Sequence, residues 1–266
     1  MVSGLRNVRP LFRDRQQSSS PPDEPLSNTF GPAAVNRLFS RRGVGHYGAM
    51  CNRYANRGSV AEIRRLAGLM DYDLATTPAT DNLAPQENIY PDQDAAVLRH
   101  RDGRLELAML RWGFPPIPGQ TAPITNIRNL QSRWWSDVNH EWITEARYRC
   151  LVPFTAFAEP VRDSTWFAVT DCEVAFFAGV WRPWRGQRLA EQPGKKRRAK
   201  EERDWKLFAF LTTDANDIVR PIHEKAMPVI LTEPAECREW LAGGAESLRL
   251  QRQYDPTTMR IISKSG

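Results

Sequence analysis

The sequence of 266 residues lacks the features that mark several special classes of protein. It has no run of about 18 consecutive apolar residues, which excludes a membrane-spanning helix. It has only four cysteines, and no two of them stand in a Cys-x-x-Cys pair or another metal-ligand spacing. This argues against a disulfide framework and a zinc site. We therefore expect no metal or other cofactor, and a protein of the reducing cytoplasm.

An excess of charge of one sign is also missing from most of the chain. Residues 1–49 contain seven Arg and three acidic residues, a net charge of +4, whereas residues 50–266 contain 30 basic and 28 acidic side chains, a net charge of +2. An anionic partner would therefore have to bind a local basic patch rather than respond to bulk charge.

Residues 1–49 have few apolar side chains and include the polar, proline-rich stretch QQSSSPPDEP at 16–25. Such a segment cannot bury enough apolar surface to offset its ordering entropy, so we expect a disordered extension. No apolar core follows its early arginines, so it is not a secretory signal. Two alternatives are an organelle transit peptide and a leader that is absent from the working protein, because translation begins at Met50 or because the leader is removed.

The rest of the chain, with 41% hydrophobic residues in the whole sequence, predicts short strands and a few helices. A capping box at Ser59 and Glu62 predicts a helix that ends near Asp71. Strands outnumber helices without βαβ alternation, which favours an α+β fold with a curled, mainly antiparallel, barrel-like sheet. The charged segment 185–204, which contains KKRR, is interpreted as a solvated hairpin loop, with phosphate contact as the alternative. We expect strands at 105–114, 149–158, 165–169, 173–181, 205–212 and 227–231, and further helices at about 214–223 and 234–241.

Cys51 is the first candidate for chemistry because it directly follows Met50. If the chain began at Met50, removal of the methionine would leave Cys51 with a free α-amine beside its thiol. Such an amine condenses with an aldehyde to an imine, and the thiol then closes a five-membered thiazolidine ring. An internal cysteine cannot do this because its nitrogen is an amide, and the alternative for a lone internal cysteine is a small buried side chain.

Three other positions could supply acid–base or polar groups. Glu159 ends an apolar run, where burial favours the protonated carboxyl group and suits it to proton transfer, although a surface acid is the alternative. His223 lies between an expected helix and an expected strand, where an imidazole can act as acid or base or simply as a structural hydrogen-bonding group. Asn126 and Arg128 could form an amide–guanidinium pair, with loop capping and a surface ion pair as their alternatives.

Together and in this order, these residues resemble the SRAP family of SOS-response-associated peptidases, also described as abasic-site processing proteins. The family typically begins Met-Cys-Gly-Arg, and Asn52 replaces the glycine here. Seven matches follow the family's order: MCNRY at 50–54, NIYP at 88–91, RWGF at 111–114, NIR at 126–128, RCLVP at 149–153 with FAE at 157–159, AGVW at 178–181, and TTDAN at 212–216 with IHEKAMPVIL at 222–231. The resemblance implies one catalytic domain over 50–241, closed by residues 242–266.

The resemblance also implies a function, because SRAP proteins bind single-stranded DNA and crosslink to the ring-opened sugar of an abasic site. Cys51 would supply the amine and the thiol, and Asn126 would position it. Glu159 would shuttle protons, and His223 would assist sugar-ring opening and release of the adduct. The residues expected to contact DNA are Arg53 and Arg128 on phosphates, Trp112 on bases unless it belongs to the core, and Pro91.

The sequence departs from the family pattern beside these residues. Ala158 and Pro160 flank Glu159 where the family has Tyr and Trp, and Leu130 stands where an acid is usual. A tryptophan common in the family after its Trp-Gly-Leu strand is absent, and Pro115, Pro116 and Pro118 lie there instead. The proton-transfer residues are therefore kept, whereas the base-stacking aromatics differ.

Two functions other than a covalent DNA crosslink stay open. One is a thiol peptidase that uses Cys51 on the protein's own leader or on other proteins, and the other is a non-catalytic single-strand binder. We expect single-stranded DNA with abasic sites as the partner, a monomer with no membrane association, and a cytoplasmic location at the nucleoid.

Overall fold

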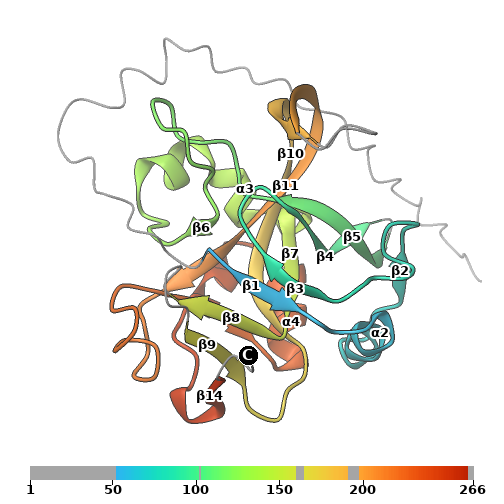
Figure 1. Cartoon of the computed structure of the whole chain (residues 1–266), viewed down its shortest axis with the longest axis vertical. Helices are drawn as coiled ribbons and strands as arrows, with labels where there is room; N and C mark the ends of the chain where they lie inside the picture. Colours follow the sequence, from blue (N-terminus) through green and yellow to red (C-terminus); the bar gives the residue numbers. More distant parts are fainter. Residues whose placement is uncertain (1–51, 102, 160–164, 191–197, 263–266) are drawn as a thin grey trace, which may run out of the picture.

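The computed structural model describes residues 52–101, 103–159, 165–190 and 198–262 (Figure 1). Three sequence predictions lie outside these residues: the extension 1–49, Cys51, and most of the KKRR run at 195–198.

Five long strands form a closed barrel at the centre of the fold. Each strand pairs antiparallel with the next in the order β11-β10-β7-β4-β5. A parallel pairing of β5 with β11, at Trp112 opposite Phe208, closes the ring. This arrangement confirms the expected α+β fold with a curled, mainly antiparallel sheet. The barrel strands are β4 (Asp94–Arg101), β5 (Arg104–Trp112), β7 (Arg149–Phe154), β10 (Ala175–Ala190) and β11 (Ala199–Thr213).

A second, smaller antiparallel sheet lies against the barrel, below its strands in Figure 1. The strand order is β14-β9-β8-β1-β3, so β1 lies between β8 and β3. The chain crosses from the barrel into this sheet at Thr155, which separates β7 from β8. The strands are β1 (Tyr54–Asn56), β3 (Gln86–Ile89), β8 (Ala156–Glu159), β9 (Thr165–Val169) and β14 (Met259–Ile262).

Short elements complete the described part of the fold. The small strands are β2 (Leu74–Thr76), which runs parallel to β5, β6 (Asn126–Ile127), which runs parallel to β11, β12 (Met227–Pro228) and β13 (Ile230–Leu231). The helices are α2 (Val60–Leu69), α3 (His140–Thr144) and α4 (Pro234–Ala242), and single helical turns span Trp134–Val138, Ala146–Tyr148, Ala245–Leu250 and Pro256–Thr258.

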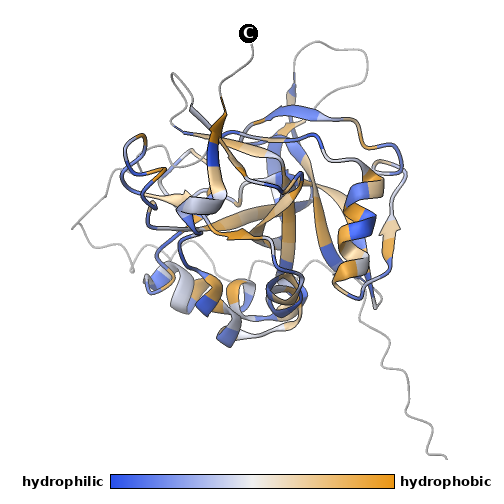
Figure 2. Ribbon diagram, turned by 90° about the horizontal axis from the view of Figure 1, so that it is seen from below, coloured by the Kyte–Doolittle hydropathy of each residue, from blue (hydrophilic) through white to orange (hydrophobic). Residues whose placement is uncertain are grey.

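Both faces of the barrel strands are buried, and alternate residues of β11 enter two different cores. Leu207, Ala209 and Leu211 pack in a core that includes residues of α2 and α4. Phe208 and Phe210 pack in a second core that includes residues of the smaller sheet. A strand that is buried on both faces is almost continuously apolar, which is the pattern of this segment. Figure 2 shows the apolar strands in the middle of the molecule.

Several sequence predictions are confirmed in detail. Ser59 caps α2, because its hydroxyl accepts a hydrogen bond from the backbone N–H of Glu62 at 3.1 Å. The other half of the expected capping box is replaced, since the Glu62 carboxylate pairs with Arg65. The strand expected at 165–169 is β9, and α4 begins at Pro234 and is followed by Gly243, as expected.

Other expectations are wrong. The single strand expected at 149–158 is divided at Thr155 into β7 and β8, which belong to different sheets. The helix expected at 214–223 is a turn around residues 217–222 in the structure. Pro221 explains this, because proline lacks an N–H group and its ring clashes with the carbonyl four residues earlier in a helix.

The charged segment 185–204 is also not a loop over its described residues. β10 and β11 continue through it as a paired ribbon, from Trp184 opposite Trp205 to Ala190 opposite Ala199. Figure 1 shows this ribbon projecting beyond the barrel. One face of this ribbon is exposed to solvent, whereas Arg188 and Ala190 on the other face are largely buried. Charged residues occur on both faces, so they hide the apolar pattern of a strand.

The buried ring of Trp112 leads to a test of how the two sheets are held together. Trp112 is 0% exposed, and its Nε1 donates to the carbonyl of Thr125 at 3.2 Å. Replacement by Phe removes this hydrogen bond and part of the packed volume, so we expect Trp112→Phe to lower the free energy of unfolding by about 1–3 kcal/mol. Urea unfolding would measure the loss, and an unchanged midpoint would contradict the structural role given to Trp112.

Candidate functional site

Glu159 and His223 form a close pair at the seam between the two sheets. Glu159 ends β8 and is 1% exposed, as its apolar sequence context predicts. Nδ1 of His223 lies 3.3 Å from Oε2 of Glu159. His223 reaches this position from the turn before β12, where its backbone N–H donates to the carbonyl of Val219 at 2.9 Å. The structure therefore brings together two residues that are 64 positions apart in the sequence.

The carboxylate of Glu159 raises the pKa of His223 above its ordinary value, mainly through its hydrogen bond to the ring. Partial burial acts in the opposite direction but is the smaller effect. The Glu159 charge and the backbone of Ala226 add to the increase, and Lys225 opposes it. The pair therefore favours the protonated form of the imidazole more than an unpaired histidine would.

Asn126 is buried at the start of β6, where it lies opposite Phe210 on β11. Its Nδ2 donates to the hydroxyl of Thr125 at 2.9 Å. The same hydroxyl group donates a hydrogen bond to Oδ1 of Asn52 at 3.4 Å. Asn126 is thus linked through one side chain to the residue that follows Cys51.

The first two described residues, Asn52 and Arg53, lie between the surroundings of Asn126 and those of Glu159. The carbonyl of Arg53 accepts a hydrogen bond from the N–H of Ala158, next to Glu159, at 2.9 Å. Asn52 contacts Thr125, next to Asn126, on the other side. Cys51 itself lies outside the described residues. Its two successors, Asn52 and Arg53, are therefore bracketed by neighbours of Asn126 and Glu159.

None of the other cysteines, all of which are described, is an activated thiol. Burial raises the pKa of Cys237 to about 12 and raises that of Cys150 further. Cys172 is half-buried, and burial also raises its pKa. A thiolate is the nucleophilic form, so burial disfavours the reactive form of all three thiols.

Arg53 contacts both a polar side chain and two aromatic rings. Its Nε donates to Oδ1 of Asn88 on β3 at 2.8 Å. Its guanidinium carbon lies 5.4 Å from the ring centre of Tyr90 and 4.9 Å from that of Trp166. Pro91, half-buried, follows Tyr90. Sequence reasoning singled out Arg53 and Pro91 but missed both aromatic residues.

Arg128 lies just beyond β6 and forms an ion pair with Asp214. Its carbonyl and that of Thr212 each accept a hydrogen bond from Nε2 of Gln251 at 2.8 Å, which ties the ends of β6 and β11 together. Arg128 lines a shallow depression in which acidic and basic side chains alternate. The other lining residues are Asp214, Ala215, Arg220, Glu224, Lys225 and Gln253.

The structure corrects the sequence analysis at Trp112. That residue was expected to contact DNA bases, with a place in the core as the alternative. Its ring is fully buried and packs against Phe208 and Phe210, with centroid distances of 6.4 and 5.3 Å. A ring without exposed surface cannot stack on a base. Its hydrogen bond to Thr125 instead supports the residue that links Asn126 to Asn52.

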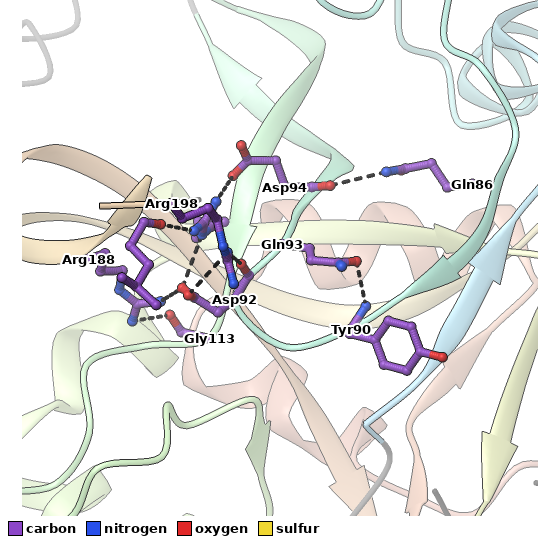
Figure 3. Close-up of polar contacts among 10 residues, drawn as sticks. Gln86, Tyr90, Asp92, Gln93, Asp94, Gly113, Arg188 and Arg198 are labelled. Atoms are coloured by element: carbon purple, nitrogen blue, oxygen red, sulfur yellow. Dashed lines mark hydrogen bonds and ion pairs between the residues drawn. The ribbon is translucent and has the colours of Figure 1, made fainter. Parts of the chain in front are cut away.

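A second polar cluster, missed by sequence reasoning, surrounds Asp92 just beyond Pro91 (Figure 3). The carboxylate accepts hydrogen bonds from Nε of Arg111 at 3.1 Å and Nη1 of Arg188 at 3.0 Å. Nη1 of Arg198 lies 3.6 Å from its other oxygen. The side chains of Arg111 and Arg188 are only 7% and 8% exposed. The cluster therefore fastens the β10–β11 ribbon to the loop that carries Tyr90 and Pro91.

No helix in the described part of the chain is long and apolar enough to cross a membrane. Among the same residues, no group of three or more His, Cys, Asp and Glu side chains could hold a metal ion.

The sequence matches one family model, described as SOS response associated peptidase (SRAP), over residues 50–264. No curated protein matches the chain in sequence.

Three crystal structures resemble the fold. A protein from Bordetella bronchiseptica superposes with a TM-score of 0.55 at 19% identity, over 80% of this chain and 100% of that chain. A protein from Bacteroides thetaiotaomicron gives 0.57 at 18% identity, over 80% of this chain and 93% of that chain. A phage-related protein from Bordetella bronchiseptica gives a TM-score of 0.52 at 20% identity, over 80% of this chain and 93% of that chain. At these identities the likeness concerns the fold alone.

The Glu159–His223 pair predicts a pH dependence. A raised pKa means that His223 contributes stability fully below its unfolded pKa and loses it as the pH rises through its higher folded pKa. In an NMR titration we expect the ring to titrate above its ordinary value of about 6.5. In Glu159→Gln it should titrate at or below that value, because burial then dominates.

His100 is the internal control for this titration. Burial lowers its pKa, and we expect Glu159→Gln to leave it unchanged. A wild-type His223 that titrates below its ordinary value would contradict the pairing.

The Asp92 cluster predicts a stability change. Asp92 has a φ of +62°, which Asn also tolerates, so Asp92→Asn removes the charge with little effect on the backbone. We expect a loss of about 1–3 kcal/mol in the free energy of unfolding, because hydrogen bonds from two nearly buried guanidinium groups lose their charged acceptor.

Asp217→Asn is the matched control, since its ion pair with Arg220 is exposed and should contribute less than about 1 kcal/mol. Equal urea midpoints for the two variants would refute the role of Asp92.

Proposed function

Because the chain belongs to the SRAP family, whose members act in the response to DNA damage and bind DNA, we propose that it processes abasic sites. In this proposal it binds single-stranded DNA and forms a thiazolidine crosslink between N-terminal Cys51 and the aldehyde of the ring-opened sugar. The observation that carries the proposal is the Glu159–His223 pair, 3.3 Å apart, beside the residues that directly follow Cys51.

The reaction needs no cofactor, because Cys51 supplies both nucleophiles. The α-amine adds to the aldehyde carbon, and loss of one water gives an imine. The thiol then adds across the C=N bond, with its sulfur on carbon and its proton on nitrogen, and closes the ring. Neither step is an oxidation or a reduction, so the protein has only to move protons. Glu159 and His223 are suited to moving them, and buried groups of this kind typically accelerate such steps by about 10²–10⁴-fold.

Each residue of the pair has a distinct task in the proposal. Glu159 takes the proton from the attacking amine and returns one to the departing hydroxyl group. His223 moves a proton between the sugar hydroxyl and the ring oxygen, which opens the deoxyribose before the reaction and assists release in reverse. Asn126, held by Thr125, would position Cys51.

DNA contacts would come from groups around this centre. Arg53 and Arg128 offer guanidinium forks for phosphates, and Pro91 follows Tyr90, whose ring contacts Arg53. Arg128 would exchange its exposed partner Asp214 for a phosphate. The almost neutral net charge of residues 50–266 makes such local contacts necessary.

The proposal requires a free amine on Cys51, so residues 1–50 must be absent from the reacting protein. The family match begins at residue 50, which supports a working chain that starts there. Autocleavage ahead of Cys51, catalysed by the same Glu159 and His223, is the other route and would account for the word peptidase in the family description.

A denaturing gel tests the function. Protein that begins at Cys51 is incubated with single-stranded DNA containing one abasic site, and we expect a band that survives denaturation. Cys51→Ala and one extra residue ahead of Cys51 should each abolish it. Glu159→Gln should slow its formation by about 100-fold or more while DNA binding is kept.

Three outcomes would count against parts of this proposal. Binding without a denaturation-resistant band would indicate a non-catalytic binder. Cleavage of an attached leader without any DNA adduct would indicate a peptidase alone. Equal crosslinking rates for wild type and Glu159→Gln would remove Glu159 from the mechanism.

A further inference from the structure

Tyr90 is an exposed aromatic residue beside the proposed DNA site. Of the large hydrophobic side chains that are exposed in the described residues, it is the only aromatic one, with 36% of its surface accessible. It lies one residue after β3, and β3 pairs with β1 at Tyr54 opposite Ile89. Its ring points away from Asp92 and towards β1 in Figure 3.

Arg53 connects this ring to a second aromatic residue. Its guanidinium lies 5.4 Å from the Tyr90 ring and 4.9 Å from the Trp166 ring. Such contacts orient a guanidinium group through the negative faces of the rings. Asn88 fixes the same group from the side. Tyr90, Arg53 and Trp166 thus form one cluster of planar groups in contact, which we name the Tyr90 platform.

Trp166 is the buried end of the Tyr90 platform. It lies directly opposite Ala158 in the pairing of β8 with β9, and it is 6% exposed. Its ring packs in a small core whose other buried members are all alanines: Ala55, Ala156, Ala158 and Ala168. Small side chains on the neighbouring strands therefore make room for the indole ring.

The Tyr90 platform is close to the reacting groups. The carbonyl of Arg53 accepts from the N–H of Ala158, and Glu159 is the next residue on that strand. A nucleotide whose sugar reaches Glu159 would therefore place a neighbouring base or phosphate within reach of Arg53 and Tyr90.

Hydrogen bonds hold the loop that carries Tyr90 in place before any ligand binds. The N–H of Tyr90 donates to Oε1 of Gln93 at 3.0 Å, which closes a tight turn. Within that turn, the carboxylate of Asp92 holds Arg111 and Arg188. A ring on a loop tied in this way loses little conformational freedom when a ligand covers it.

We propose that Tyr90 is a nucleobase-stacking residue, on which the base next to the abasic nucleotide lies while Arg53 contacts the adjoining phosphate. An abasic site leaves the neighbouring base without a stacking partner on one side, and the Tyr90 ring supplies one. Every base has a π-face, so this contact selects single strands without selecting a sequence. The inference rests on the proposed function, since it assumes that the sugar lies at Glu159.

Binding to an unreactive DNA tests the stacking separately from the chemistry. The probe is a single strand with a tetrahydrofuran abasic analogue, which has no aldehyde, flanked on one side or the other by fluorescent 2-aminopurine. Protein that begins at Cys51 should quench the fluorescence of one of the two probes. Tyr90→Ala should abolish the quenching and weaken binding by about tenfold, whereas Tyr90→Phe should keep both.

Ile261→Ala is the matched control, because Ile261 is 53% exposed on β14, at the opposite edge of the same sheet. It should bind the probes like wild type. Unchanged binding and quenching in Tyr90→Ala, with an unchanged urea midpoint, would overturn the platform even if wild type crosslinks abasic DNA. Tyr90-dependent quenching in a protein that never crosslinks would support the platform and overturn the proposed chemistry.

Discussion

The packing of the Tyr54 ring is the interaction on which the site depends. Tyr54 is fully buried and meets Trp112, Phe177 and Phe210 edge-on, with centroid distances of 5.0, 5.7 and 6.2 Å. It heads β1, which belongs to the smaller sheet, while its ring contacts belong to the barrel. Burial of such a ring contributes a large, non-directional stabilisation, and the edge-to-face geometry makes the packing specific. Three residues after Cys51, the chain is therefore held in one position relative to both sheets.

The polar residues of the site take their environment from this apolar seam. Glu159 and Asn126 each end or begin a strand whose neighbours are buried, so both have little exposed surface. Electrostatic contacts are stronger where water is excluded, which explains how one carboxylate can raise the pKa of His223 against partial burial. The same exclusion of water would favour imine formation, since that step releases water. The proposed chemistry would thus depend on the seam where the barrel and the smaller sheet meet.

Sequence reasoning finds the parts of this structure that local patterns encode. An apolar run ending in a carboxylate predicts the buried Glu159, and β-branched and aromatic runs predict β9 and the cores of β10 and β11. It fails where residues that are far apart in the sequence determine the local structure. The charged ribbon beyond Trp184 is a strand only because its partner runs beside it. Asp92 gains its role from arginines 19, 96 and 106 positions away, and no local pattern indicates such a cluster.

The position of the site at the seam makes its geometry depend on the relation between the two sheets. Glu159 ends β8 of the smaller sheet, and Arg53 directly precedes β1 of the same sheet. Asn126 begins β6 and His223 lies in the turn before β12, and these two strands pair with β11 of the barrel. A small rotation of one sheet against the other would separate Glu159 from His223 without breaking any strand pairing. Interlocking rings resist such a rotation, because close-packed cores shift between discrete arrangements and do not deform continuously. The aromatic core between the sheets is therefore a condition for the proposed proton transfer as well as for stability.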